Sequence, residues 1–181
     1  MEYTLGLDIS TSCTGWCILN ASGQFIDMGY ITLGSKLSSF QKAGVVSDAL
    51  SNLHIKYNIT NVVIEENLQA FRPGFSSAKT LLSLARFNGI VSYLAQEEYA
   101  TEPKFINVNV ARKKVGLKIV SKRKGGAPTK EQVFNWVDEK VKFSWPMKTL
   151  KSGPRKDQVV LEAGCFDAAD AYVIACAGYD M

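Results

Sequence analysis

Four acidic residues stand at positions where α/β proteins commonly carry their chemistry. Asp8 and Glu65 each close a short apolar segment that we expect to be a strand, and strand ends form the usual ligand-binding edge of such a sheet. Asp167 and Asp170 stand three residues apart, so on a helix they share one face. Each acid also has a structural interpretation, as a turn former, an exposed strand end or a helix N-terminal charge. That interpretation is weakest for Asp170, because the apolar run at 172–175 predicts burial and a buried carboxylate needs a partner.

Brought together, the four carboxylates predict a site for divalent metal ions. Like charges at one edge cannot all ionise unless cations join them. A set of oxygen donors favours Mg²⁺, with Mn²⁺ as a substitute, and two such ions can activate water and stabilise the leaving oxygen in phosphodiester cleavage. The chain has one histidine, His54, which excludes mechanisms that need two histidines in one subunit.

Positive charge is concentrated in one part of the chain. The net charge is only +4, but the stretch from Lys104 to Lys156 contains 15 Lys and Arg residues against three acids. A basic stretch beside an acidic remainder indicates that a polyanion, such as a nucleic-acid backbone, is held on one surface. The alternative interpretation is a solvated lysine-rich surface.

Length and composition place the chain among ordinary globular proteins. Its 181 residues predict one domain, 1–181, and 46% hydrophobic residues argue against disorder. No apolar run approaches the ~20 residues of a membrane span, and no signal peptide is visible, so we expect no membrane partner. The four cysteines lack the spacing of common zinc or redox motifs, and unpaired thiols favour a cytoplasmic location.

Alternating strand and helix patterns must position these residues. The pattern predicts an α/β fold with a mixed five-stranded sheet, in which the first three strands are antiparallel and the fourth is parallel to the first. The helix expected over 76–99 is apolar nearly all round, which predicts burial on several sides and a subunit interface. Thr129 and Gln132 have capping-box spacing at the start of another helix. The expected strands are 3–8, 14–20, 25–33, 61–65 and 105–108. The other expected helices are 40–57, 110–115 and one that ends near residue 178. The basic segments 116–128 and 142–158 are expected to be loops.

Four motifs, in this order, resemble those of the RuvC-like Holliday junction resolvases of the RNase H-like superfamily, including phage-type members. They are LGLDISTSCTGW, VVIEE, GGAPTKEQV and FDAADAYVIA, and the resemblance spans about residues 3–178. It implies an RNase H-like fold, a homodimer, two Mg²⁺ ions per site and symmetric nicking of four-way DNA junctions. By position, the resemblance assigns metal binding and catalysis to the four acids and a catalytic role to Lys130.

The resemblance leaves the DNA contacts less defined than the acids. A further functional basic residue precedes the Gly/Lys segment in the family, and Arg112, Lys113 and Lys114 all stand there. An aromatic residue of the family is displaced here, which makes Phe71 and Arg72 candidate junction contacts. The candidate DNA-binding residues are Arg112, Lys113, Lys114, Lys118, Lys122, Arg123, Lys124 and Lys130.

Three other functions are compatible with parts of the sequence. The chain could cleave flaps or other branched DNA, or bind nucleic acid without cleaving it. The segment GLDISTS also resembles the first phosphate loop of actin-like kinases, but those enzymes need a second such domain, for which 181 residues are too few. We therefore expect branched DNA as the partner and no nucleotide cofactor.

Overall fold

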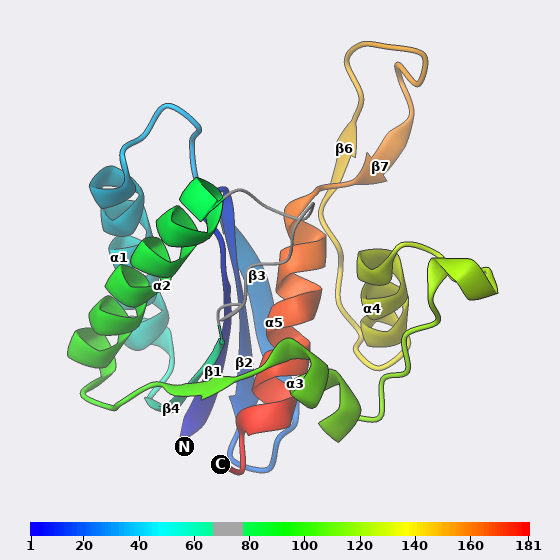
Figure 1. Ribbon diagram of the computed structural model, residues 1–181. Helices are drawn as coiled ribbons and strands as arrows, with labels where there is room; N and C mark the ends of the chain where they lie inside the picture. The colour runs from blue at the N-terminus through cyan, green and yellow to red at the C-terminus, as the bar shows by residue number, and fades with distance from the viewer. Residues whose placement is uncertain (67–77) are drawn as a thin grey trace.

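A mixed five-stranded sheet forms the centre of the structure, a computed structural model that describes residues 1–66 and 78–181 (Figure 1). The strand order is β3-β2-β1-β4-β5; β1, β2 and β3 are antiparallel, and β1, β4 and β5 are parallel. This arrangement confirms the predicted α/β fold and mixed sheet. The strands are β1 (Tyr3–Ile9), β2 (Cys13–Asn20), β3 (Phe25–Thr32), β4 (Ile59–Glu65) and β5 (Lys104–Ile106).

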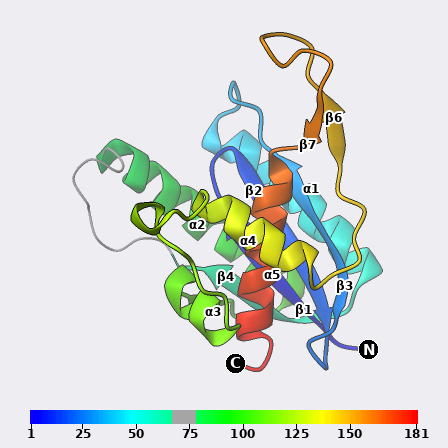
Figure 2. The same cartoon turned by 90° about the vertical axis from the view of Figure 1, so that its right-hand side faces the viewer.

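Helices cover both faces of the sheet (Figures 1 and 2). On one face lie α1 (Ser39–Lys56) and α2 (Ala78–Tyr99), and on the other lie α3 (Val108–Lys114), α4 (Thr129–Asp138) and α5 (Gly164–Gly178). Successive strand side chains point to opposite faces, so Leu5 and Leu7 pack toward α1 and α2, whereas Cys17 and Val63 pack toward α5. The apolar side chains of β1 and β4 are thereby divided between two cores.

Within the single chain, helix α2 is buried along one side only, so burial of its other sides in a subunit interface stays a prediction. Phe87 and Val91 are fully buried in the core shared with α1, whereas Leu82 is 68% exposed and Tyr93 is 59% exposed. The sheet and α1 together cover only one stripe of the helix. A dimer surface on α2 can therefore include Leu82 but not Phe87.

Several local boundaries also differ from the sequence prediction. The fifth strand ends at Ile106, because Asn107 caps α3 by accepting a hydrogen bond from the backbone N–H of Asn109 at 3.0 Å. Pro128, not Thr129, occupies the N-cap position of α4. The amide of Gln132 forms no capping box and instead bonds the backbone of Val120 and Ala127.

Both predicted basic loops contain secondary structure. Residues 116–128 include the short 3-10 helix η1 (Lys122–Lys124), and residues 142–158 contribute to a two-stranded antiparallel sheet of β6 (Met147–Thr149) and β7 (Val159–Leu161). No helix within residues 1–66 and 78–181 is long and apolar enough to cross a membrane.

Candidate active site

Asp8 and Glu65 lie side by side at the ends of two neighbouring parallel strands. Leu7 of β1 is in register with Ile64 of β4, so the next residues along each strand are Asp8 and Glu65. Leu7 and Ile64 pack toward α1 and α2, and alternation therefore turns both acids toward α5. The Asp8 carboxyl donates a hydrogen bond to the Glu65 carboxylate. Glu66, the next acid, lies past the end of β4, where its backbone N–H donates to the carbonyl of Ile106 at 2.9 Å.

Two glycines allow α5 to lie directly on the sheet above these acids. Gly15 pairs with Asp8 across β1 and β2. A Cβ atom at Gly15 would lie 2.0 Å from the backbone carbonyl oxygen of Asp167, and one at Gly6 would lie 2.6 Å from that of Ala171. Any larger residue would separate the helix from the strands. The first turns of α5, with Asp167 and Asp170, therefore lie against the strand ends that carry Asp8 and Glu65.

The four carboxylates interact as one electrostatic cluster. Burial is the main cause that raises the pKa of Asp8 well above its usual value, and the charges of Glu65, Asp170 and Asp167 raise it further. Burial also raises the pKa values of Glu65, Asp167 and Asp170, with added repulsion between acids at Glu65 and Asp170. Negative charge is therefore costly here unless a cation compensates it.

Arg112 is the basic residue that contacts the cluster. Its Nη2 atom, from the last turn of α3, donates a hydrogen bond to Oδ1 of Asp170 at 3.2 Å, and the two side chains are 17% and 19% exposed. Arg112 partly offsets the rise in the pKa values of Asp170 and Glu65. Its buried Nε atom has no hydrogen-bond partner among the described residues. Lys114 instead pairs with Asp180 at 2.7 Å, and Lys113 is exposed.

The other candidate basic residues are more exposed than Arg112. Lys130, at the start of α4, places Nζ 4.8 Å from the ring centroid of Phe166, and its charge partly offsets the rise in the pKa of neighbouring Asp167. Four residues are exposed on the segment that Gln132 holds at Val120 and Ala127; they are Lys118, Lys122, Arg123 and Lys124. Phe71 and Arg72 lie outside the described residues.

Cys13 is a member of this site that sequence reasoning did not identify. Its thiol donates a hydrogen bond to the Asp167 carboxylate, and burial together with that negative charge raises the pKa of the thiol to about 12. Cys13 stands two residues before Gly15 on β2, so period-two alternation turns it toward α5. That alternation is the sequence signal that would have found it.

The carboxylate oxygens at this edge of the sheet are the ligands that hard divalent cations prefer, although the side chains do not form a complete metal-binding site. Within the part of the chain that the structure describes, no three Asp, Glu, His or Cys side chains form a ready-made metal-binding group. The chemistry of the set is nevertheless that of a magnesium or manganese site: it offers carboxylate oxygens, and burial together with the charges of the neighbouring acids raises the pKa of Asp8.

Comparison with known proteins relates the chain to one group of enzymes. No protein-family model matches it. Over 149 residues it is 28% identical to the crossover junction endodeoxyribonuclease RuvC of Aliarcobacter butzleri (strain RM4018), across 81% of this chain and 88% of that protein. This chain is a distant relative of RuvC.

Solved structures of RuvC-like resolvases share the fold. Thermus thermophilus RuvC in complex with its Holliday junction substrate matches with a TM-score of 0.60 and 13% identity, covering 98% of this chain and 92% of that one. The yeast mitochondrial Holliday junction resolvase Ydc2 matches with a TM-score of 0.55 and 15% identity, covering 96% and 76%. The architecture is therefore the RNase H-like fold that the sequence predicted.

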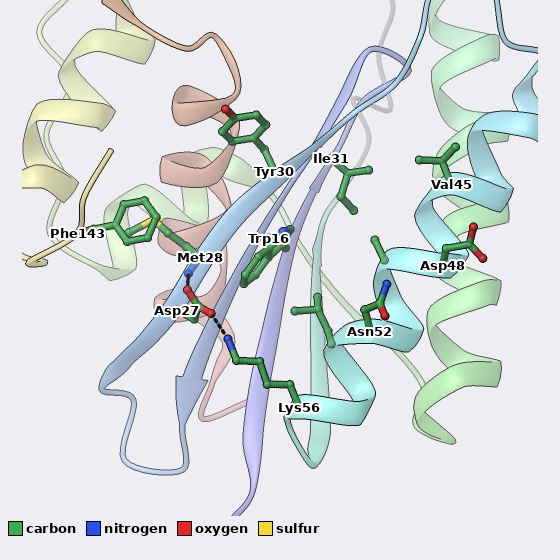
Figure 3. A pocket seen from close by; sticks show the side chains of 12 residues that line it. Trp16, Asp27, Met28, Tyr30, Ile31, Val45, Asp48, Asn52, Lys56 and Phe143 are labelled. Carbon is green, nitrogen blue, oxygen red and sulfur yellow. Dashed lines mark hydrogen bonds and ion pairs between the residues drawn. The ribbon is translucent and has the colours of Figure 1, made fainter. Parts of the chain in front are cut away.

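One cavity of about 730 Å³ lies away from the carboxylates. It lies between α1 and the β2–β3 ribbon, with Trp16, Ile31 and Asn52 in its lining (Figure 3). The salt bridge between Lys56 and Asp27, at 2.8 Å, closes one side. None of the four carboxylates lines this cavity.

Proposed function

We propose that residues 1–181 act as one nuclease domain that resolves four-way DNA junctions by paired, symmetric nicks. The observation that carries this proposal is the convergence of four carboxylates, from β1, β4 and α5, in one cluster whose members raise the pKa of Asp8. The relationship to RuvC and the likeness to a RuvC structure that holds a Holliday junction support the choice of substrate.

The four acids would hold two Mg²⁺ ions, or Mn²⁺ in their place. When bound, such a pair supplies an activated water and stabilises the leaving oxygen of the phosphodiester. The chain's own residues prepare for this: burial and the charge of Glu65 raise the pKa of Asp8, so a bound cation would compensate both carboxylates. Cys13 orients Asp167 through its thiol hydrogen bond. Arg112 holds Asp170 and balances part of the negative charge.

Basic residues around the cluster would bind the DNA backbone. Lys130, beside Asp167, is the candidate to contact the phosphate next to the cleaved bond, and Arg112 is favoured over its neighbours because it alone of the three bonds a cluster acid. The exposed segment 116–128 would track a duplex arm. Each phosphate that these cations neutralise should add about 0.9 to the salt dependence of binding. Phe71 and Arg72 remain proposed contacts at the junction centre.

We further propose that the enzyme acts as a homodimer through α2. A four-way junction presents two strands for cleavage, so two sites related by a two-fold axis are needed, and such an axis uses the same patch on both subunits. The exposed apolar side chains of α2, Leu82 and Tyr93, offer such a patch.

The decisive experiment compares branched substrates in Mg²⁺. Labelled four-way junction, flap, Y-shaped and linear DNA are incubated with the protein and with Asp8→Asn and Asp170→Asn. The junction should receive two opposed nicks, and both variants should bind it without cleaving it, while Asp48→Asn, an exposed acid of α1, should cleave normally. Faster cleavage of flaps would replace the junction assignment with a flap nickase. Binding without cleavage by the unmodified protein would make it a non-catalytic DNA-binding protein.

A further inference from the structure

The hairpin of β6 and β7 is a basic arm that lies outside the main sheet. It comprises residues 147–161, and its two short strands pair only with each other among the described strands. Residues 151–159 are all exposed. The arm carries four cations and one acid; they are Lys148, Lys151, Arg155, Lys156 and Asp157. The hairpin contributes no residue to the carboxylate cluster, so the cluster does not explain the positive charge of the hairpin.

The tip of the hairpin is an ordered turn. The backbone N–H of Leu150 donates to the carbonyl of Gln158 at 2.9 Å, and the N–H of Asp157 donates back to the carbonyl of Leu150 at 2.8 Å. The N–H of Lys156 donates to the carbonyl of Gly153 at 3.1 Å, where Gly153 has a φ of 82°. The cations are therefore presented on a closed backbone rather than on a free loop, which lowers the ordering cost of binding.

The base of the hairpin is fixed to the domain. An isolated two-stranded hairpin is only marginally stable in water, but here the N–H of Glu162 donates to the carbonyl of Pro146 at 3.0 Å. The same carbonyl accepts a 3.4 Å hydrogen bond from the thiol of Cys165, and Tyr30 donates to the Glu162 carboxylate. The arm is thus anchored to β3 and to the first turn of α5.

The anchor sets where the arm points. Only two residues, Glu162 and Ala163, separate β7 from α5, whose first turn carries Asp167. Figure 1 shows the hairpin projecting beyond this end of α5, away from the sheet. The paired part of the hairpin from Met147 to Leu150 rises by about 3.3 Å per residue, or roughly 10 Å, and the turn that carries Lys151, Arg155 and Lys156 lies beyond it. The tip of the hairpin therefore lies beyond the end of α5, away from the sheet (Figure 1).

The charge of the arm identifies its partner. Within residues 1–66 and 78–181, none of its four cations forms an ion pair, whereas Lys56 and Lys114 elsewhere pair with acids at 2.8 and 2.7 Å. Uncompensated cations on a rigid ribbon match a polyanion, and a two-stranded ribbon fits the major groove of a duplex, which is about 12 Å wide. The exposed apolar side chains Met147 and Val159 lie at the base, not at the tip.

We propose that the β6–β7 hairpin binds a second duplex arm of branched DNA, other than the arm whose strand enters the carboxylate cluster. The proposal rests on the proposed function for the identity of the partner. Because the arm reaches past the site, a linear duplex seated at the cluster leaves the tip without a ligand. The hairpin therefore contributes to selection of branched over linear DNA.

The test measures binding in an Asp8→Asn background, where cleavage is removed. The variant replaces Lys151, Arg155 and Lys156 with Gln, and its matched control makes the same charge change at three exposed cations outside both the hairpin and α2, Lys36, Lys140 and Lys142. Affinities for a four-way junction and for a linear duplex of equal arm length are measured from 50 to 200 mM salt. Thermal unfolding of both variants should match the parent, since all six side chains are exposed.

The hairpin variant should bind the junction about tenfold or more weakly at low salt, with the salt slope reduced by about 0.9 for each lost phosphate contact. The linear duplex should lose much less affinity, and the control variant should bind both DNAs like the parent. Equal losses on the two DNAs, or no loss on either, would overturn the proposal. If the proposed nuclease function is wrong, the result is different: the unmodified protein will cut no branched DNA, whatever the effect of the hairpin variant on binding.

Discussion

The close approach of α5 to β2 offers a sharp test of how the carboxylate cluster is assembled. In Gly15→Ala, the new methyl group would lie 2.0 Å from the carbonyl oxygen of Asp167 and 2.3 Å from its carbonyl carbon. Cβ atoms essentially never approach other heavy atoms within 3.0 Å. The first turn of α5 must therefore move away from β2 by about 1 Å, and Asp167 must move with it.

The size of the effect follows from this displacement. Overpacking of a close contact costs about 1–3 kcal/mol, which in a chain of this length lowers the melting temperature by roughly 2–12 °C. A shift of about 1 Å in a catalytic group can reduce the rate by about 10²-fold. We expect Gly15→Ala to remain folded, to nick four-way junctions about 10²-fold more slowly, and to bind Mn²⁺ more weakly.

Thermal unfolding, calorimetric Mn²⁺ titration and a junction-nicking assay measure these three effects. Gly44→Ala is the matched control, because a Cβ atom there has no neighbour within 4 Å among the described atoms, and Ala in a helix interior is more stable than Gly by about 1 kcal/mol. The control should melt slightly higher and cleave normally. If Gly15→Ala kept the parent's melting temperature and Mn²⁺ affinity, the packing of α5 against Gly15 would not be what positions Asp167.

Three further predictions test the electrostatics and the assembly. Burial and repulsion raise the pKa of Asp8, so the metal-free protein loses stability as the pH rises through that pKa. Asp8→Asn should therefore raise the melting temperature in EDTA at pH 8 but have little effect on it near pH 4. Equal shifts of the melting temperature at both pH values would contradict this reasoning. Arg112→Gln removes a counter-ion from Asp170 and should lower the stability of the metal-free protein by about 1–3 kcal/mol. Mn²⁺ should then raise the melting temperature of this variant more than that of the parent, and the excess should be smaller for Arg112→Lys, which keeps the charge. An equal Mn²⁺ effect in the Gln variant and the parent would refute the argument. Leu82→Glu should convert a dimer to a folded monomer in sedimentation measurements. Phe87→Glu should instead unfold the chain, because Phe87 is fully buried. If the unmodified protein stays monomeric with junction DNA bound, the dimer proposal is wrong.

The sheet and its acids were predictable because local rules fix them. Alternation along β1 and β4 assigns each side chain to a face, and the crossover rule makes the two strands parallel, so Asp8 and Glu65 had to meet. The spacing of Asp167 and Asp170 placed both on one side of α5 in the same way. These inferences needed no knowledge of how the helices pack.

The remaining features depend on tertiary contacts that the sequence does not display. Three adjacent basic residues follow one another at the end of α3, and only the orientation of α3 against α5 selects Arg112. The strands of the β6–β7 hairpin have only three residues each, and β7 is apolar throughout, so the hairpin shows no alternation of apolar and polar residues. Gln132 matches a capping pattern, yet Pro128 occupies the cap and the Gln132 amide closes the 116–128 segment instead.

The order of the elements along the chain has a consequence for synthesis. Helix α5 packs against β1, β2 and β3, the first strands made, but it is the last helix in the sequence. A ribosome adding about 5–20 residues per second takes roughly 7–26 s to produce the ~130 residues between β3 and α5. Until then the apolar face that includes Leu19 and Val63 is uncovered and open to chaperones. The carboxylate cluster also stays incomplete during that time, so a growing chain cannot bind metal there before its last helix docks.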